Sequence, residues 1–287
     1  MTKAPYILKA PTRQSTSVVF ASPHSGRDYP WSFLRQTVLD ERAIRSSEDA
    51  FVDLLFDSAP DHGAPLLAAT APRAFIDVNR SADELDPALI EGVRKTTHNP
   101  RVTSGLGVIP RVVANGRSIY RGKMTLDDAR GRLRDYWRPY HDRLKLLLDA
   151  TQAAHGEAIL IDCHSMPHEA IDSIGTSKAP HPQIVLGDRF GAAADQYVVD
   201  RIEAAFAAAG LRVARNSPFA GAYTAQHYGR PSKGQHVIQV EIDRSLYMNE
   251  RLVRPSGSFQ AFQSRMRSII AEICEIGRRD KMPLAAE

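Results

Sequence analysis

Short apolar runs alternate with longer amphipathic segments along most of the chain. Runs of strand length cover residues 17–22, 65–69, 74–78, 158–163, 183–187, 211–214 and 236–242. Apolar positions recur every three or four residues, as in amphipathic helices, over residues 126–153, 191–209 and 258–278. A further helix is expected to start near Glu48, with Ser46 and Ser47 before it as capping residues. Strands and helices that alternate in this way predict an α/β protein.

The interval between residues 81 and 122 departs from this alternation. It has no clear period and contains scattered glycine, proline and arginine residues. A long irregular segment in a compact protein usually serves a function, so we expect this one to be functional. No repeat, low-complexity tract or linker-like composition interrupts the chain, and we predict a single catalytic α/β domain over residues 1–287.

Composition narrows the classes of protein that need to be considered. The chain is 43% apolar and 24% charged, which is typical of a globular protein. Its net charge of +4 is a weak argument for nucleic acid and suits a small anionic substrate equally well. Only Cys163 and Cys274 are present, which excludes a disulfide framework, and no stretch resembles a signal peptide or membrane span. We therefore expect a cytoplasmic protein without membrane contact.

The basic, aromatic stretch Arg132–Lys145 is the best argument for nucleic-acid binding. Arginine together with tryptophan and tyrosine is a composition that binds single-stranded nucleic acid. However, Trp137 and Tyr140 fall on the same helical stripe as leucines such as Leu144. Packing of an amphipathic helix against a core explains this stripe better, and we expect no nucleic-acid partner.

Three of the predicted strands end on side chains that can support hydrolysis by a metal ion. His24 follows the first run, His164 follows the run at 158–163, and Glu241 lies at the end of the run at 236–242, directly after Val240. Ligands of open α/β sheets bind beyond the carboxyl ends of the strands. Two imidazoles as ligands and a carboxylate as base are the components of a catalytic zinc site. The sequence predicts such a site if the fold brings these ends together.

The residues next to His164 and Glu241 add detail through the two-residue period of a strand. Asp162 lies on the same face as His164 and can orient its imidazole, whereas Cys163 points the opposite way. Asp243 lies on the same face as Glu241 and is the second candidate for a catalytic base.

Six segments, in order, also resemble the N-formylglutamate amidohydrolase family. They are PHSGRDYP (23–30), SSEDAFVDLL (46–55), FIDVNRS (75–81), IDCHSMP (161–167), NSPFAGAYTAQHYG (216–229) and QVEIDRSLYM (239–248). The resemblance covers about residues 17–250. It implies a three-layer α/β/α fold with a mixed central sheet, similar to that of zinc carboxypeptidases. It also implies hydrolysis of N-formyl-L-glutamate to formate and L-glutamate, the last step of one histidine-degradation route.

The resemblance assigns one zinc ion per chain to His24, His164 and a carboxylate. Related zinc carboxypeptidases and aspartoacylases have a glutamate three residues after the first histidine, but Arg27 occupies that position here. Glu48 or Asp49 is then the third ligand, with a slight preference for Asp49. Acidic residues are also favoured at a helix start by the helix dipole alone, so this pair does not require a metal.

The resemblance further implies the roles of several other residues. Glu241 is expected to take a proton from the attacking water and return it to the leaving amine. Asn79 and Arg80 resemble the pair that holds a substrate carboxylate in zinc carboxypeptidases, where a planar guanidinium binds in a bidentate manner. Arg73 is expected to polarise the formyl carbonyl.

The substrate implied is a small anionic N-formyl amino acid with a second carboxylate. Arg111, Arg121 and Arg244 are candidates for binding that second carboxylate, and the sequence does not rank them. A related zinc amidohydrolase or carboxypeptidase-like enzyme acting on another N-acyl amino acid is the alternative function. A basic nucleic-acid-binding protein without catalysis is a third hypothesis. The sequence leaves open whether the chain forms homo-oligomers and which metal it uses.

Overall fold

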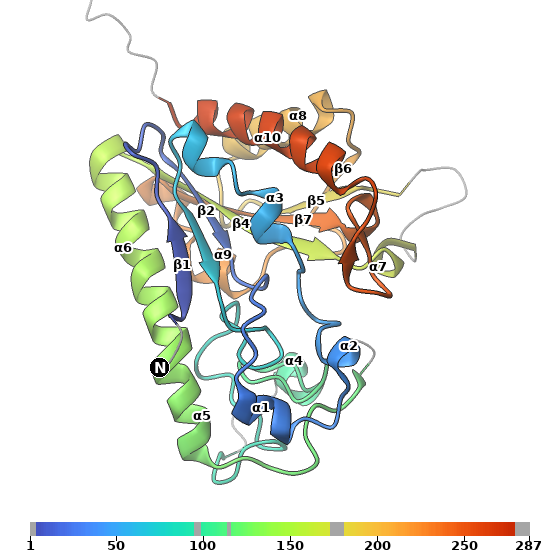
Figure 1. The fold of residues 1–287 in the computed structure, drawn as a ribbon. Coiled ribbons are helices and arrows are strands. Elements are labelled where there is room, and N and C mark those ends of the chain that lie inside the picture. The colour runs from blue at the N-terminus through green and yellow to red at the C-terminus, as the bar shows by residue number, and fades with distance from the viewer. Residues whose placement is uncertain (1–3, 95–98, 114–115, 173–180, 279–287) are drawn as a thin grey trace, which may run out of the picture.

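A mixed seven-stranded sheet forms the centre of the molecule in the computed structural model, which describes residues 4–94, 99–113, 116–172 and 181–278 (Figure 1). The strand order is β1-β3-β2-β4-β7-β5-β6. β3, β2, β4 and β7 are parallel to one another. At the two sides of this group, β1 is antiparallel to β3 and β5 is antiparallel to β7. The strands are β1 (Tyr6–Lys9), β2 (Val18–Ser22), β3 (Leu66–Ala69), β4 (Ala158–Met166), β5 (Ile184–Gly187), β6 (Val213–Arg215) and β7 (Gln235–Asp243). The α/β fold with a mixed sheet is confirmed.

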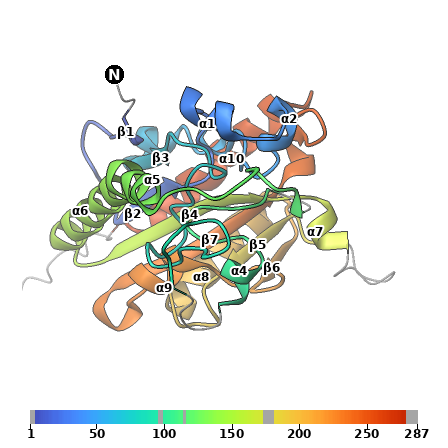
Figure 2. The same cartoon turned by 90° about the horizontal axis from the view of Figure 1, so that it is seen from below.

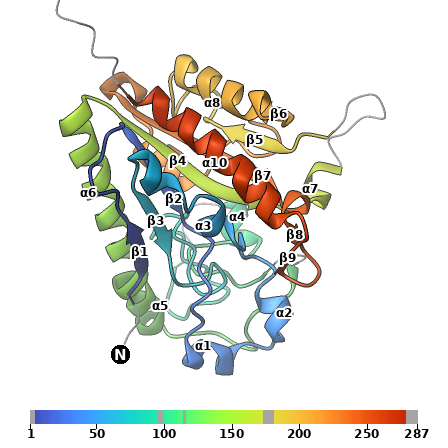
Figure 3. The ribbon, with the colours of Figure 1, turned by 45° about the horizontal axis from the view of Figure 1, so that its top comes forward.

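Helices cover both faces of this sheet. α3 (Val52–Leu55), α8 (Gln196–Ala208) and α10 (Phe259–Ile276) pack on one face, and Figure 3 shows α10 lying across the strands. α6 (Arg138–His155) and α9 (Tyr223–Tyr228) cover the other face. Alternate residues of each central strand therefore enter two different cores. This explains why the central strands read as nearly continuous apolar runs.

The remaining elements are short. The helical ones are α1 (Trp31–Gln36), α2 (Glu41–Ile44), η1 (Ala59–His62), α4 (Pro100–Thr103), α5 (Leu126–Arg132), a π turn η3 (Leu133–Trp137), α7 (Glu169–Asp172), η4 (Pro231–Lys233) and η5 (Arg244–Leu246). A separate hairpin consists of β8 (Met248–Asn249) and β9 (Arg254–Pro255). None of the described helices has the length and apolar character needed to cross a membrane.

The predicted helix over residues 126–153 is present as α5, the π turn and α6 in succession. Tyr140, Leu144 and Leu148 are buried against the sheet, and Trp137 packs against the same cluster. The aromatic residues of this stretch thus belong to the core, as the helical stripe indicated.

A cap with its own apolar core is formed by residues that precede β3 in the chain together with the segment that follows it. Side chains of residues 33–44, 71–93, 108–113 and 119–137 pack together there, with buried Ile76, Leu89 and Ile109 among them. Figure 1 shows α1, α2 and α4 toward the lower end of the molecule, and Figure 2, seen from below, shows α4 on the opposite side from α1 and α2. Described residues of the irregular interval 81–122 therefore pack as part of this cap, and the interval contains α4.

Two predicted elements are wrong. Residues 74–78 form a turn instead of a strand, because the N–H groups of Phe75 and Ile76 both donate to the carbonyl of Pro72. Their apolar side chains pack in the cap, which explains why the run resembled a strand. The helix expected near Glu48 begins only at Val52, after Phe51, which has a left-handed backbone with φ 68°.

Candidate active site

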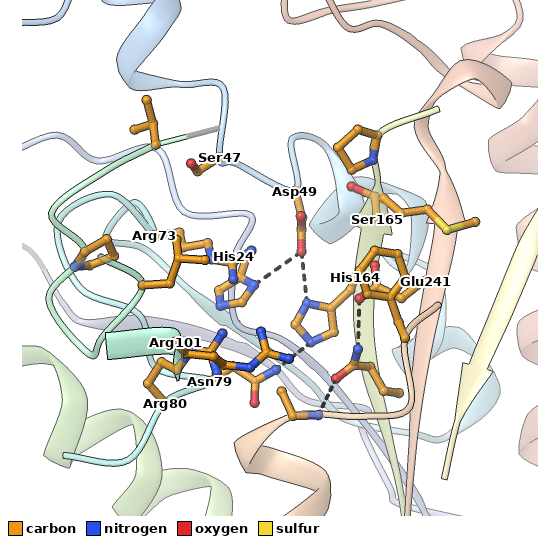
Figure 4. A pocket seen from close by; sticks show the side chains of 18 of the residues that line it. His24, Ser47, Asp49, Arg73, Asn79, Arg80, Arg101, His164, Ser165 and Glu241 are labelled. Carbon is orange, nitrogen blue, oxygen red and sulfur yellow. Dashed lines mark hydrogen bonds and ion pairs between the residues drawn. The ribbon is translucent and has the colours of Figure 1, made fainter. Parts of the chain in front are cut away.

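Neighbouring parallel strands bring the predicted chemical groups to one place. His24 follows the end of β2, and β2 pairs with β4, the strand that carries His164. Glu241 of β7 lies directly opposite His164 in the register between β4 and β7. Asp49 reaches the same point from the segment before α3, where its N–H donates to the carbonyl of His24 at 3.0 Å. Figure 4 shows these side chains converging on one cavity.

His24, Asp49 and His164 form a group whose donor atoms lie within 4.8 Å of one another. Oδ2 of Asp49 lies 2.9 Å from Nδ1 of His164 and 3.4 Å from Nδ1 of His24. All three side chains are buried. Burial disfavours the charge of Asp49, but the hydrogen bonds and charges of His164 and His24 hold its pKa well below the usual range.

This donor set fits a metal ion. Nδ1 of His24 is buried yet has no hydrogen-bond partner in the described part of the chain. A buried polar atom normally has a hydrogen-bond partner, so one without a partner is expected where an ion binds. Two imidazole nitrogens and one carboxylate oxygen are the ligands of many catalytic zinc sites, in which the fourth position stays open.

The structure does not bring Glu48 into this group. Its carboxylate accepts two hydrogen bonds from Arg45, at 3.0 and 3.1 Å, and a third at 2.6 Å from Tyr29. Burial and the neighbouring Glu48 charge together raise the pKa of the Tyr29 hydroxyl, which therefore remains a donor. Of the two carboxylates predicted as alternatives, Asp49 and not Glu48 belongs to the group that could hold a metal ion.

A second carboxylate, Asp77, orients His24 and was not identified from the sequence. Its Oδ1 lies 2.7 Å from Nε2 of His24 and accepts the N–H of Asn79 at 2.8 Å. Its Oδ2 accepts from Nε of Arg73 at 2.9 Å. Burial opposes this charge, but the contact with His24 and the Arg73 guanidinium hold the pKa of Asp77 well below normal. A carboxylate behind a histidine ligand fixes its tautomer and strengthens metal binding.

His164 has the partner that the strand period predicted. Oδ2 of Asp162 lies 3.1 Å from Nε2 of His164. Nδ2 of Asn79 lies 3.1 Å from the same nitrogen and donates to Oδ2 of Asp162 at 3.4 Å, and its Oδ1 accepts two hydrogen bonds from Thr224 at 2.8 Å. Both ends of the Asn79 amide are therefore engaged within the protein, and in this structure Asn79 supports His164.

Glu241 is buried beside His164 and lines the cavity. Burial raises its pKa to about 7, although the positive charge of His164 opposes the shift. Oε1 accepts a hydrogen bond from Gln239 at 2.8 Å. Asp243, the second candidate, does not line the cavity. It is bound by Nδ1 of His168 and by the N–H of Ser245, both at 2.9 Å.

The cavity has a volume of about 500 Å³ and is lined by several arginines. In the described part of the chain these are Arg73, Arg80, Arg101 and Arg244. Arg244 donates to Oδ1 of Asp49 at 3.0 Å and to Ser165 at 3.1 Å, so it supports a predicted metal ligand.

Arg111 and Arg121, two of the three candidates for the second carboxylate, are not among the described residues that line the cavity. Arg111 donates to Oδ2 of the buried Asp86 at 2.9 Å, and this ion pair holds its side chain inside the cap. Arg121 is exposed and does not line the cavity. Arg101 was missed because nothing in the irregular interval around it distinguishes one arginine from another.

Comparison with known proteins places the chain in a family. The family model described as N-formylglutamate amidohydrolase matches residues 16–248. The chain belongs to this family. An N-formylglutamate deformylase from Pseudomonas putida is 31% identical over 81% of this chain and 82% of its own length. Another from Pseudomonas aeruginosa is 28% identical over 92% and 93%.

Solved structures agree with this membership. The crystal structure of N-formylglutamate amidohydrolase from Ralstonia eutropha JMP134 matches with a TM-score of 0.90 at 34% identity, covering 96% of this chain and 99% of that chain. A gene product from Agrobacterium tumefaciens matches with a TM-score of 0.66 at 15% identity, covering 96% of each chain, and shares the fold.

Proposed function

We propose that the chain is a zinc-dependent amidohydrolase that converts N-formyl-L-glutamate to formate and L-glutamate, with one zinc ion per chain. The observation that carries the proposal is the buried group of His24, Asp49 and His164 beside Glu241, in a cavity lined by arginines. Membership of the N-formylglutamate amidohydrolase family supports the choice of substrate. The relatives that bear the name deformylase support the type of bond that is cleaved.

His24, Asp49 and His164 would hold the metal. Zinc held by three protein ligands makes water a stronger acid and polarises a carbonyl oxygen. Asp77 and Asp162, which contact Nε2 of His24 and of His164, would keep these nitrogens protonated and leave Nδ1 of each ring free to bind the ion.

Glu241 is the group in the cavity best suited to move a proton. Its Oε1 is fixed by Gln239, and Oε2 has no hydrogen bond to any described residue. A pKa of about 7 allows the carboxylate to accept a proton from the attacking water near neutral pH. The same group then returns the proton to the nitrogen of the departing glutamate, which leaves as a neutral amine.

Arg80 is placed to bind the α-carboxylate of the substrate. Its side chain is 6% exposed, and its Nε is buried without a hydrogen bond to any described residue. A carboxylate satisfies such a group by a bidentate interaction that lysine cannot reproduce. Arg73, held by Asp77, would face the formyl oxygen and stabilise the negative charge that develops there.

Metal analysis of two variants tests this proposal. His24→Ala and His164→Ala should each lose the bound zinc and essentially all hydrolysis, because each removes one ligand. His155→Ala, at the end of α6, is the matched control and should keep both. A full equivalent of zinc in both ligand variants would place the metal elsewhere.

Formate or acetate release from a panel of N-formyl and N-acetyl amino acids tests the substrate. The highest kcat/KM is expected for N-formyl-L-glutamate. A clear preference for another N-acyl amino acid would instead support the related amidohydrolase that the sequence also allows.

A further inference from the structure

Two of the arginines that line the cavity are already paired with buried carboxylates. Nε of Arg73 donates to Asp77 at 2.9 Å, and Nη2 of Arg244 donates to Asp49 at 3.0 Å. Through these ion pairs, Arg73 supports the carboxylate that orients His24, and Arg244 holds Asp49 in place. They leave less capacity for binding a charged substrate group.

The other two arginines have hydrogen-bonding capacity to spare. Nε of Arg80 lies 3.9 Å from the nearest oxygen of Asp77, too far for a hydrogen bond. The side chain of Arg101 makes no hydrogen bond or ion pair with the residues that the structure describes. The acidic residue Glu84 lies near Arg80, but its oxygens accept from Ser81 at 3.1 Å and from Asn99 at 3.4 Å.

Arg80 and Arg101 lie close together. Burial lowers the pKa of Arg80, and after the opposing charge of Asp77 the nearby charge of Arg101 lowers it further. Figure 4 shows the two side chains on the same side of the cavity. Two adjacent cations repel each other unless anionic groups lie between or beside them. The pair therefore favours a ligand with two carboxylates over a ligand with one.

Arg80 and Arg101 differ in how deeply they are buried. This difference indicates which carboxylate of the substrate each of them would bind. Arg80 is buried, whereas Arg101 is exposed on α4. The start of α4 is fixed by Pro100 at its first position and by Asn99, whose Oδ1 accepts from the N–H of Arg101 at 3.0 Å. The backbone that carries Arg101 is thus held in place while its guanidinium remains open to a ligand.

We propose that Arg101 binds the side-chain carboxylate of the substrate and thereby sets the preference for acidic N-formyl amino acids. Arg80 binds the α-carboxylate deeper in the cavity. This inference rests on the proposed function, because it assigns the second carboxylate of N-formylglutamate. It gives a specificity role to a residue of the irregular interval before α5.

Kinetics with a matched pair of substrates test the assignment. N-formyl-L-glutamine has the same shape as N-formyl-L-glutamate but lacks the second charge. Arg101→Gln should lower kcat/KM for N-formyl-L-glutamate by about 10-fold or more, the scale of one lost charge-assisted hydrogen bond. It should leave N-formyl-L-glutamine nearly unchanged. Arg101→Lys should restore part of the preference, since it keeps the charge without the planar fork.

Arg121→Gln is the control, because it removes the same charge from an exposed arginine outside the cavity. It should leave the ratio between the two substrates as in the wild type. The proposal is overturned if Arg101→Gln keeps the wild-type ratio, or if it weakens both substrates equally.

A binding measurement separates failure of this proposal from failure of the proposed function. If the wild-type protein hydrolyses neither substrate, the proposed function is wrong, and calorimetry with glutarate, a simple dicarboxylate, then decides the role of Arg101. Weaker glutarate binding by Arg101→Gln than by the wild type and Arg121→Gln supports the role. Equal affinity, or no binding by the wild type, overturns it.

Discussion

Replacing Asp77 by asparagine should weaken both the metal site and the folded state. The carboxylate of Asp77 accepts from His24, Arg73 and the backbone of Asn79, and its side chain is 3% exposed. Asparagine keeps the shape and one acceptor oxygen, but it removes the charge. Its amide would also place a donor against the donor groups of Arg73 or His24.

The size of the effect follows from these contacts. Hydrogen bonds to charged groups contribute about 1.5–3 kcal/mol each, and loss of one partner of a buried ion pair costs about 3–5 kcal/mol. Because the side chain of Arg73 is 28% exposed and water can partly solvate it, we expect a loss near the lower end, about 3 kcal/mol. Loss of the partner behind a histidine ligand typically lowers metal affinity about 10- to 100-fold.

The stability difference should depend on pH with a defined sign. The pKa of Asp77 is lower in the folded than in the unfolded protein. Its contribution is therefore complete above the unfolded pKa of about 3.9 and is lost as the pH falls through the lower folded value. Urea denaturation in the presence of a chelator should show the full difference between wild type and Asp77→Asn at pH 7. The difference should shrink below about pH 4.

Asp86→Asn provides a matched control. Asp86 is also a buried aspartate of the cap, and it also accepts from an arginine, Arg111, at 2.9 Å. It has no recorded contact with His24, so its loss should lower stability and leave metal affinity unchanged. Equal zinc affinity in wild type and Asp77→Asn would refute the role assigned to Asp77, whatever happens to stability.

Further predictions concern Glu241, which is proposed to transfer the proton, and Arg80, which is proposed to bind the α-carboxylate of the substrate. Glu241→Gln should retain zinc and lower kcat by about 10²- to 10⁴-fold, as measured by metal analysis and turnover of the same sample. In the wild type, kcat/KM should fall on the acid side as Glu241 is protonated, with a midpoint below its metal-free pKa of about 7, because a bound cation favours the carboxylate. A midpoint that persists in Glu241→Gln would assign it to another group. Arg80→Ala should lower kcat/KM for N-formyl-L-glutamate and N-formyl-L-glutamine alike, by about 10- to 150-fold, and Arg80→Lys should restore only part of the loss.

The sequence was sufficient to predict that His24, His164 and Glu241 lie near one another. Local patterns locate the strand ends, and the strands concerned are parallel neighbours. An apolar run followed by a polar residue is a local pattern, and it correctly located His24, His164 and Glu241 at the ends of β2, β4 and β7. Parallel strands bring their carboxyl ends to one edge without further information. The non-local part of the site was thus supplied by a general property of the fold.

Local sequence patterns predicted the wrong structure at positions where tertiary packing determines the backbone conformation. The apolar residues of 74–78 can fill a strand or a turn, and only their burial in the cap selects the turn. The choice between Glu48 and Asp49 depends on the backbone around them. Asp49 is tied to the carbonyl of His24, and the left-handed Phe51 delays the helix that the sequence placed at Glu48.

The arginines were hard to rank because their side chains are long and their partners lie far away in the sequence. Arg111 is withdrawn from the site by Asp86, 25 residues earlier. Arg101 lines the cavity, and its side chain makes no hydrogen bond or ion pair with the residues that the structure describes. Neither relationship follows from composition or periodicity, since both depend on how the cap folds around its own core.

Asp162 and Asp77, the carboxylates that contact His164 and His24, differ in the same way in how far the sequence predicts them. Asp162 lies two residues before His164 in a single strand, so the strand period alone places it beside the imidazole. Asp77 is 53 residues from His24 and reaches it from a turn that the sequence presented as a strand. His164 is thus oriented by a residue of its own strand, whereas the orientation of His24 depends on the folding of the cap. Disruption of the cap core should therefore weaken the contact that orients His24 while leaving the contact between Asp162 and His164 in place.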